Sequence, residues 1–133
     1  MDIQSELTSL NKLLNSSLIK DTYADLDKME VSLIGGESPF LVYKMYLNQD
    51  VTKKDLYEHV DPFWLIDNHV QNYITKLIPF KHLPINSGDY QVEIYNKSGI
   101  KIFDWLEDLM VMNPGTMGKT QWERMSKSLN QTQ

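Results

Sequence analysis

The sequence contains no cysteine, and this absence removes several kinds of site at once. A chain without cysteine forms no disulfide framework, and it offers neither a thiolate ligand for a metal nor a thiol nucleophile. Several catalytic classes are therefore excluded.

Arginine is almost missing. Of 13 basic residues only Arg124 is an arginine, and 18 acidic residues leave a formal net charge of −5. Bidentate contacts to phosphate or guanine need guanidinium groups, so the sequence predicts no nucleic-acid partner. The acidic excess favours solubility and a basic partner. An acidic protein that mimics nucleic acid is a further alternative, although the carboxylates are spread along the chain.

Long apolar runs are also missing. The longest runs, such as that from Phe63 to Ile66, are far shorter than the roughly 20 residues that span a bilayer. Asp2 and Glu6 stand where a secretory signal carries positive charge. We therefore expect no membrane segment and a cytoplasmic protein, in the host cytoplasm if the gene is viral. The preference for lysine over arginine is typical of the AT-rich genomes of phages and many small bacteria.

The composition that is present predicts one folded domain. The chain has 133 residues, of which 41% are apolar and 23% charged, and these are ordinary globular values. No internal linker divides residues 1–133. The predicted elements do not alternate regularly between strand and helix, which favours an α+β fold. We expect two β-hairpins that form an antiparallel sheet packed with about five helices.

A helix is predicted from about residue 2 to 19. Apolar residues recur there at helical spacing: Ile3, Leu7, Leu10, Leu14 and Leu18. We expect this stripe to dock on the protein's own sheet. The stripe also allows a coiled-coil seam, and thus a homo-oligomer through the N-terminal helix. Residues 20–29 are predicted as a second helical segment.

Two β-rich runs, residues 30–34 and 40–47, flank a loop that contains two glycines and a proline. This pattern predicts the first β-hairpin. Both faces of the second run are apolar, so that strand is expected inside the sheet.

Helix-capping residues begin the next two elements. Thr52 and Asp55 resemble a capping box for a short helix that ends near Val60. Asp61 and Pro62 are a preferred N-cap and first helical residue, and they predict a helix over residues 62–78. Its buried face is expected to carry Phe63, Ile66, Val70, Tyr73, Ile74 and Leu77.

The segment YQVEIYNKSGIKIF predicts a second hairpin. A three-residue loop, Lys97-Ser98-Gly99, places Ile94 opposite Ile102 and uses Gly99 for a left-handed conformation. The inner face then carries Val92, Ile94, Ile100 and Ile102, and the outer face carries Glu93, Tyr95, Lys101 and Phe103. The two outer aromatic residues form either a second buried layer or a partner surface.

Residues 113–120, NPGTMGKT, end like a phosphate-binding loop of the form G-x-x-x-x-G-K-[ST]. Asn113 replaces the first glycine, however, and Pro114 removes a backbone donor. The element before this stretch is a predicted helix from Asp104 to Met112 rather than a buried strand. We therefore interpret residues 113–116 as a turn, and we expect no nucleotide and no other cofactor.

The carboxylates of Asp104, Glu107 and Asp108 fall in the first turn of that predicted helix. They offset the positive end of the helix dipole there, which explains them better than a paired-carboxylate catalytic site.

A last, hinged helix is predicted at about 120–130, with its core over 121–129. Thr120 and Glu123 form a capping box for it. Trp122, Met125 and Leu129 lie on one side. A helix this short is marginal alone, so its apolar side docks either on its own domain or in a partner's groove.

The three histidines are candidates for a metal or catalytic site: His59, His69 and His82. Carboxylates lie near them in sequence: Asp55, Asp61 and Asp67. The chain has no His-x-x-x-His pair, and Asp67 and His69 point apart on a helix. We therefore expect structural ion pairs and no metal site.

Together these patterns predict a small acidic protein–protein interaction module that acts by surface burial, without catalysis. A phage or bacterial inhibitor, immunity or assembly factor has this character. The expected contact residues are Trp122, Met125 and Leu129, followed by Tyr95 and Phe103. The alternative is a small hydrolase or transferase that uses His59 or His69 with a carboxylate.

Overall fold

The computed structural model describes residues 2–21, 23–37, 39–56, 61–85 and 90–104. The predictions for the chain after Asp104, which are two helices and the turn between them, lie outside these ranges. So does the end of the short helix predicted up to Val60.

Four strands form one mixed sheet in the order β1-β2-β3-β4. They are β1 (Leu26–Ile34), β2 (Phe40–Leu47), β3 (Tyr90–Tyr95) and β4 (Lys101–Asp104). The pairs β1–β2 and β3–β4 are antiparallel, as predicted, and β2 lies inside the sheet. The central β2–β3 pair is parallel, so the prediction of a purely antiparallel sheet is wrong. A helical connection separates β2 from β3, and such a crossover is what allows two strands to pair in parallel.

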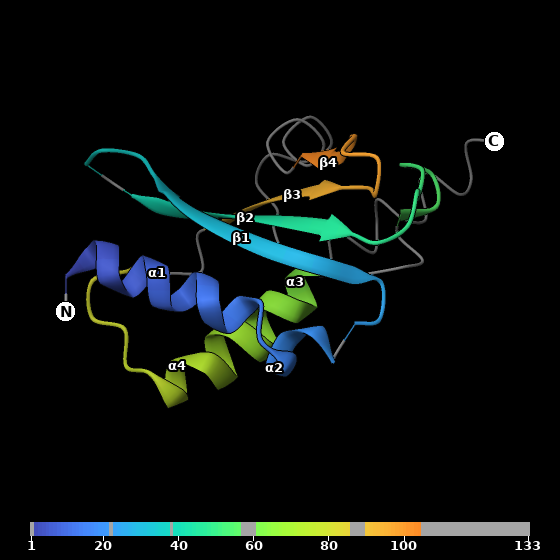
Figure 1. Cartoon of the computed structure of the whole chain (residues 1–133). Coiled ribbons are helices and arrows are strands. Elements are labelled where there is room, and N and C mark those ends of the chain that lie inside the picture. The colour runs from blue at the N-terminus through green and yellow to red at the C-terminus, as the bar shows by residue number, and fades with distance from the viewer. Residues whose placement is uncertain (1, 22, 38, 57–60, 86–89, 105–133) are drawn as a thin grey trace.

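Two helical segments, rather than about five helices, pack on the sheet within the described residues, and both lie on the same face of it (Figure 1). The first consists of α1 (Ile3–Leu14) and α2 (Ser17–Lys20). The second is a continuous rod of α3 (Pro62–Leu65), η2 (Ile66–Ile74) and α4 (Thr75–Leu77). Among the described residues no helix is long and apolar enough to cross a membrane.

The first helical segment begins where predicted and breaks at Asn15. The Asp2 carboxylate accepts a hydrogen bond from the Ser5 amide at 2.8 Å and caps α1. Leu10 and Leu14 are fully buried, so the apolar stripe docks on the protein's own core, as expected. The predicted second helical segment over residues 20–29 is wrong, because β1 already begins at Leu26.

Two asparagines fasten α1 to the free edge of β1. Asn11 accepts a hydrogen bond from the Val31 amide at 2.8 Å and donates one to the Val31 carbonyl at 3.0 Å. Asn15 does the same for Met29, at 2.9 and 2.7 Å. Each side-chain amide thus supplies the donor and the acceptor that a neighbouring strand would supply, and it covers an edge that would otherwise be open to other chains.

The second helical segment begins at the predicted cap, where the Asp61 carboxylate accepts hydrogen bonds from the Phe63 and Trp64 amides at 3.1 and 3.0 Å. The expected buried face is confirmed except at Tyr73 and Leu77, which are exposed. Residues Ile66–Ile74 form a π-helix. A π-helix has more residues per turn than the 3.6 assumed in the prediction, so Tyr73 turns away from the sheet.

A bulge corrects the predicted register of the second hairpin. The loop is as predicted: the Asn96 amide donates to the Ile100 carbonyl at 2.9 Å, and Gly99 has a φ of 84°. Tyr95 pairs with Lys101, but the register then shifts, and Ile94 pairs with Phe103 instead of Ile102. The extra residue turns Phe103 onto the inner face, where it is only 1% exposed, while Ile100 is 61% exposed.

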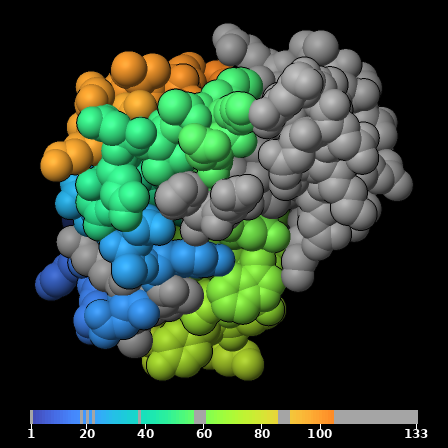
Figure 2. All heavy atoms as spheres, turned by 90° about the vertical axis from the view of Figure 1, so that its right-hand side faces the viewer, coloured from blue at the N-terminus to red at the C-terminus, as the bar shows by residue number. Residues whose placement is uncertain are grey.

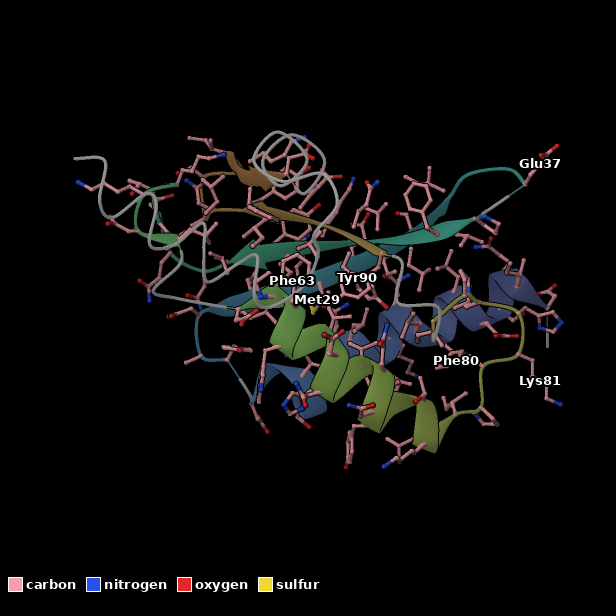
Figure 3. All side chains as sticks on the ribbon, turned by 180° about the vertical axis from the view of Figure 1, so that it is seen from behind. Met29, Glu37, Phe63, Phe80, Lys81 and Tyr90 are labelled. Atoms are coloured by element: carbon pink, nitrogen blue, oxygen red, sulfur yellow. The ribbon has the colours of Figure 1, made fainter. Side chains whose placement is uncertain are left out.

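The hydrophobic core fills the space between the sheet and the helices. Met29, Phe63 and Tyr90 gather there from β1, α3 and β3 (Figure 3). The Tyr90 ring lies edge-on to Tyr43, with centroids 5.7 Å apart, and 5.9 Å from Phe63. The described helices therefore cover one face of the sheet, and the core lies between them and that face (Figure 1).

Candidate functional site

Three side chains form a stack on the outer face of the sheet, opposite the helices. Tyr46 of β2 and Tyr95 of β3 are neighbours in the parallel register, and their rings stack with centroids 5.1 Å apart and planes 14° apart. The Lys28 ammonium of β1 lies 4.8 Å from the centroid of the Tyr46 ring. Strand alternation explains the placement, because the neighbouring residues Met29, Met45 and Ile94 face the core.

Charged side chains border this stack. The Tyr95 hydroxyl donates a hydrogen bond to Glu93 at 2.7 Å, and Lys101 binds Asp104 at 2.9 Å and Glu93 at 3.6 Å. Desolvation by burial, followed by the hydrogen bond to Glu93, raises the pKa of Tyr95 to about 12. The hydrogen bond to Asp104 raises the pKa of Lys101. At neutral pH the tyrosine is therefore neutral and the lysine is charged.

A hollow with a volume of about 430 Å³ opens beside the stack, at the end of the sheet. Three segments surround it: the start of β1, the end of β2 with its following loop, and the β3–β4 turn. Figure 2 views this end of the sheet, where the three segments adjoin in blue, green and orange. The lining residues are Asp27, Lys28, Tyr46, Leu47, Asn48, Asn96, Lys97 and Gly99.

The structure places only some of the contact residues predicted from the sequence on the outer face of the sheet. Tyr95 lies on the outer face, where it was expected. Phe103 does not, because the bulge at Ile102 turns it into the core, so its predicted position on the outer face is wrong. The other expected contacts lie outside the described residues: Trp122, Met125 and Leu129. Sequence reasoning missed Tyr46, whose importance comes from the parallel pairing with β3.

The described histidines lie apart from each other. His69 packs edge-on to Trp64, with ring centroids 5.0 Å apart, whereas Asp67 accepts a hydrogen bond from the Tyr90 hydroxyl at 2.9 Å. The Asp55 amide donates to the Thr52 hydroxyl oxygen at 3.3 Å, which is the predicted capping contact, and the Thr52 hydroxyl donates to the Asp55 carboxylate at 2.9 Å. His59 lies outside the described ranges. In the part of the chain that the structure describes, no group of three histidine or acidic side chains could hold a metal ion.

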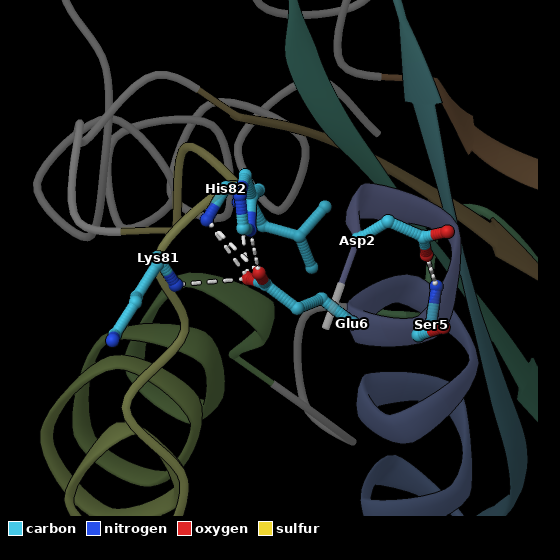
Figure 4. Close-up of polar contacts among 6 residues, drawn as sticks. Asp2, Ser5, Glu6, Lys81 and His82 are labelled. Carbon is cyan, nitrogen blue, oxygen red and sulfur yellow. Dashed lines mark hydrogen bonds and ion pairs between the residues drawn. The ribbon is translucent and has the colours of Figure 1, made fainter.

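Glu6 and His82 form a pair that sequence reasoning missed (Figure 4). Glu6 lies on α1 and is only 2% exposed. Its carboxylate accepts hydrogen bonds from the backbone amides of Lys81, His82 and Leu83, at 2.9 to 3.3 Å, and it also contacts Nδ1 of the half-exposed His82 ring. Burial favours the neutral carboxyl, but the hydrogen bonds from the His82 amide, the His82 ring and the Leu83 amide outweigh it and lower the pKa of Glu6 to about 2. Glu6 is therefore ionised at neutral pH.

The hydroxyl of Tyr90 and the carboxylate of Asp67 form a polar contact beside the core. Desolvation by burial, followed by the nearby charge of Asp67, raises the pKa of Tyr90 and also that of the buried Tyr43. Both phenols thus remain protonated at physiological pH, and they act as packing groups rather than as bases.

Comparison with known proteins found no relative: no protein-family model, no curated protein and no solved structure matches the chain.

Proposed function

We propose that this chain is a small acidic interaction module that acts in the cytoplasm by burying surface against another protein, without catalysis. A phage or bacterial inhibitor, immunity or assembly factor would work in this way. The observation that supports it best is the Tyr46–Tyr95 stack on the sheet face opposite the helices. Tyrosine is enriched at interface hot spots because it offers a large, rigid and partly polar contact at low entropic cost.

The electrostatics around the stack agree with a specific contact surface. Lys28 covers Tyr46 from one side, and Glu93 orients the hydroxyl of Tyr95. The two rings are thus held in place before any partner arrives, and this preorganisation lowers the entropy lost on binding.

Affinity capture from the source cell, followed by measurement of the affinity for the captured protein, tests the proposal. Tyr46→Ala and Tyr95→Ala should each weaken the affinity at least roughly 30-fold, the effect of losing about 2 kcal/mol at a hot spot. Tyr73→Ala removes an exposed tyrosine on the helical side and is the matched control. Native affinity in both sheet variants would overturn the proposed surface.

A second contact set is proposed at Trp122, Met125 and Leu129, the apolar side of the helix predicted over residues 121–129. Trp122→Ala should mainly abolish complex formation if this side meets the partner, and mainly lower the melting temperature if it docks on its own domain. Binding and melting measured on the same variant separate the two outcomes. No change in either would refute both.

The contact between His82 and Glu6 supports an alternative function, that of a small hydrolase or transferase. An ionised carboxylate that binds Nδ1 leaves Nε2 of the half-exposed ring available as a general base, which is the orientation found in His–acid catalytic pairs. The Glu6 carboxylate also holds three backbone amides, so its structural role is sufficient to explain it. Hydrolytic or transferase activity that disappears in His82→Gln would favour the alternative.

A further inference from the structure

We infer that the outer face of the sheet is the docking surface for residues 105–112 of the same chain, which follow β4 and lie outside the described residues. The observation that supports it best is Val42 of β2, which is only 1% exposed. Its neighbours Leu41 and Tyr43 belong to the hydrophobic core and Val42 does not, so strand alternation directs Val42 to the outer face. A valine on a sheet face that is open to water keeps part of its surface accessible. Another part of the chain therefore packs on Val42.

The polar residues around Val42 outline the covered area. Glu93 of β3 and Asp104 of β4 lie on the outer face, and their side chains are only 21% and 17% exposed. Gln91, the cross-strand partner of Val42, is also only partly exposed. On β1, by contrast, Glu30 of the same face is exposed. The cover therefore lies over β2, β3 and β4 rather than over the middle of β1.

The sequence identifies the segment that can supply an apolar cover. Residues 86–89, Asn-Ser-Gly-Asp, contain no apolar side chain. Residues 57–60 connect Leu56, which lies in the core, to the start of α3 on the helical side of the sheet (Figure 1). Residues 105–112, WLEDLMVM, are mostly apolar. The helix predicted there carries one apolar stripe, which consists of Trp105, Leu109 and Met112.

The path of the chain directs this segment towards Val42. β4 runs antiparallel to β3 and its last residue, Asp104, pairs with Glu93, so the chain leaves β4 in the direction of Gln91. Gln91 in turn pairs with Val42. Neighbouring strands lie about 4.8 Å apart, which places β2 about 10 Å from β4. A helix over residues 104–112 extends about 13 Å, because it rises about 1.5 Å per residue, and it can therefore reach across β3 to β2.

Nuclear Overhauser effects measured on the full chain test the inference. The methyl groups of Val42 should show such effects to the stripe of the segment, which is Trp105, Leu109 and Met112. The methyl groups of Ile100, which is 61% exposed, should show none to these three residues. In a mixture of isotope-labelled and unlabelled protein, no effect between different chains should appear.

Two variants of the segment provide the matched comparison. Leu109→Ser should abolish the effects from Val42 and shift the amide signals of Val42 and Gln91, because it places a hydroxyl in an apolar contact. Met110→Ser should leave both unchanged, since Met110 lies on the other side of the predicted helix. If Leu109→Ser does not fold, the wild-type spectra alone decide.

Three outcomes would overturn the inference. Effects from Val42 only to side chains of the sheet, such as Phe40 and Lys44, would mean that these neighbours cover it. Effects to Trp122 would make a later part of the chain the occupant, and effects between chains would make a second copy the occupant. The inference is independent of the proposed function, which is tested by partner capture with variants of Tyr46 and Tyr95.

Discussion

Glu6 shows how one residue can join parts of the chain that are distant in sequence. Its carboxylate binds the backbone of residues 75 to 77 positions further along. No local pattern encodes this contact, because a glutamate in the first turn of a helix is already explained by the helix dipole. The consequence is that the loop after α4 is fastened to α1 by a single ionised group.

Replacement of Glu6 by Gln should lower the melting temperature at neutral pH, since the amide cannot accept hydrogen bonds through both of its terminal atoms. The pKa of Glu6 is about 2 in the folded protein, against an ordinary value of 4.5. Its contribution to stability is therefore complete above about pH 4.5 and is lost as the pH falls towards about 2. Wild-type melting temperatures should fall over this window more steeply than those of Glu6→Gln, in circular dichroism melts at a series of pH values.

Glu30→Gln is the control for this measurement, because Glu30 is an exposed carboxylate on β1. Melting curves of wild type and Glu6→Gln that decrease in parallel through the window would show that Glu6 does not fasten the loop.

At the scale of the element, the β3–β4 hairpin reverses the roles of two apolar residues. The regular register assigns Ile100 to the inner face and Phe103 to the outer face. The bulge turns Phe103 into the core, whereas Ile100 keeps its predicted partner Asn96 beside the turn and is exposed there. Phe103→Ala should therefore destabilise the protein by about 3–5 kcal/mol through loss of buried surface and the resulting cavity. Ile100→Ala should change the free energy of unfolding by less than about 0.5 kcal/mol. Urea denaturation measures both, and the opposite order would restore the regular register.

The edge of β1 offers a second test at this scale. Asn11→Ala leaves the amide and carbonyl of Val31 without their partners, and Asn15→Ala does the same for Met29. Each change should cost about 1–3 kcal/mol. Hydrogen exchange gives a sharper signature: protection of the Val31 or Met29 amide should fall, while that of Glu30, which alternation directs towards β2, should persist. Lys12→Ala, at an exposed position of the same helix, should leave the exchange pattern unchanged.

Local signals predicted the elements that depend on neighbouring residues. The caps at Asp61 and Thr52, the boundaries of β2 and the glycine turn at Gly99 all follow from residues within a few positions of each other. The features that could not be predicted depend on distant contacts. The parallel β2–β3 pairing and the stack of Tyr46 on Tyr95 form only when segments more than 40 positions apart meet. The bulge at Ile102 forms because core packing overrides the regular register of the hairpin.

At the scale of the whole molecule, the apolar stripe of the N-terminal helix packs against the core of its own chain. Leu10 and Leu14 are fully buried, and Ile3 is the exposed apolar residue of α1. A seam between subunits through this helix therefore has little surface left to bury. We expect the thermal midpoint to stay constant over an about 100-fold range of protein concentration, because only association of folded subunits makes it concentration-dependent. A midpoint that rises with concentration in the wild type and stays constant in Ile3→Ser would instead place a homo-oligomer contact at the start of α1.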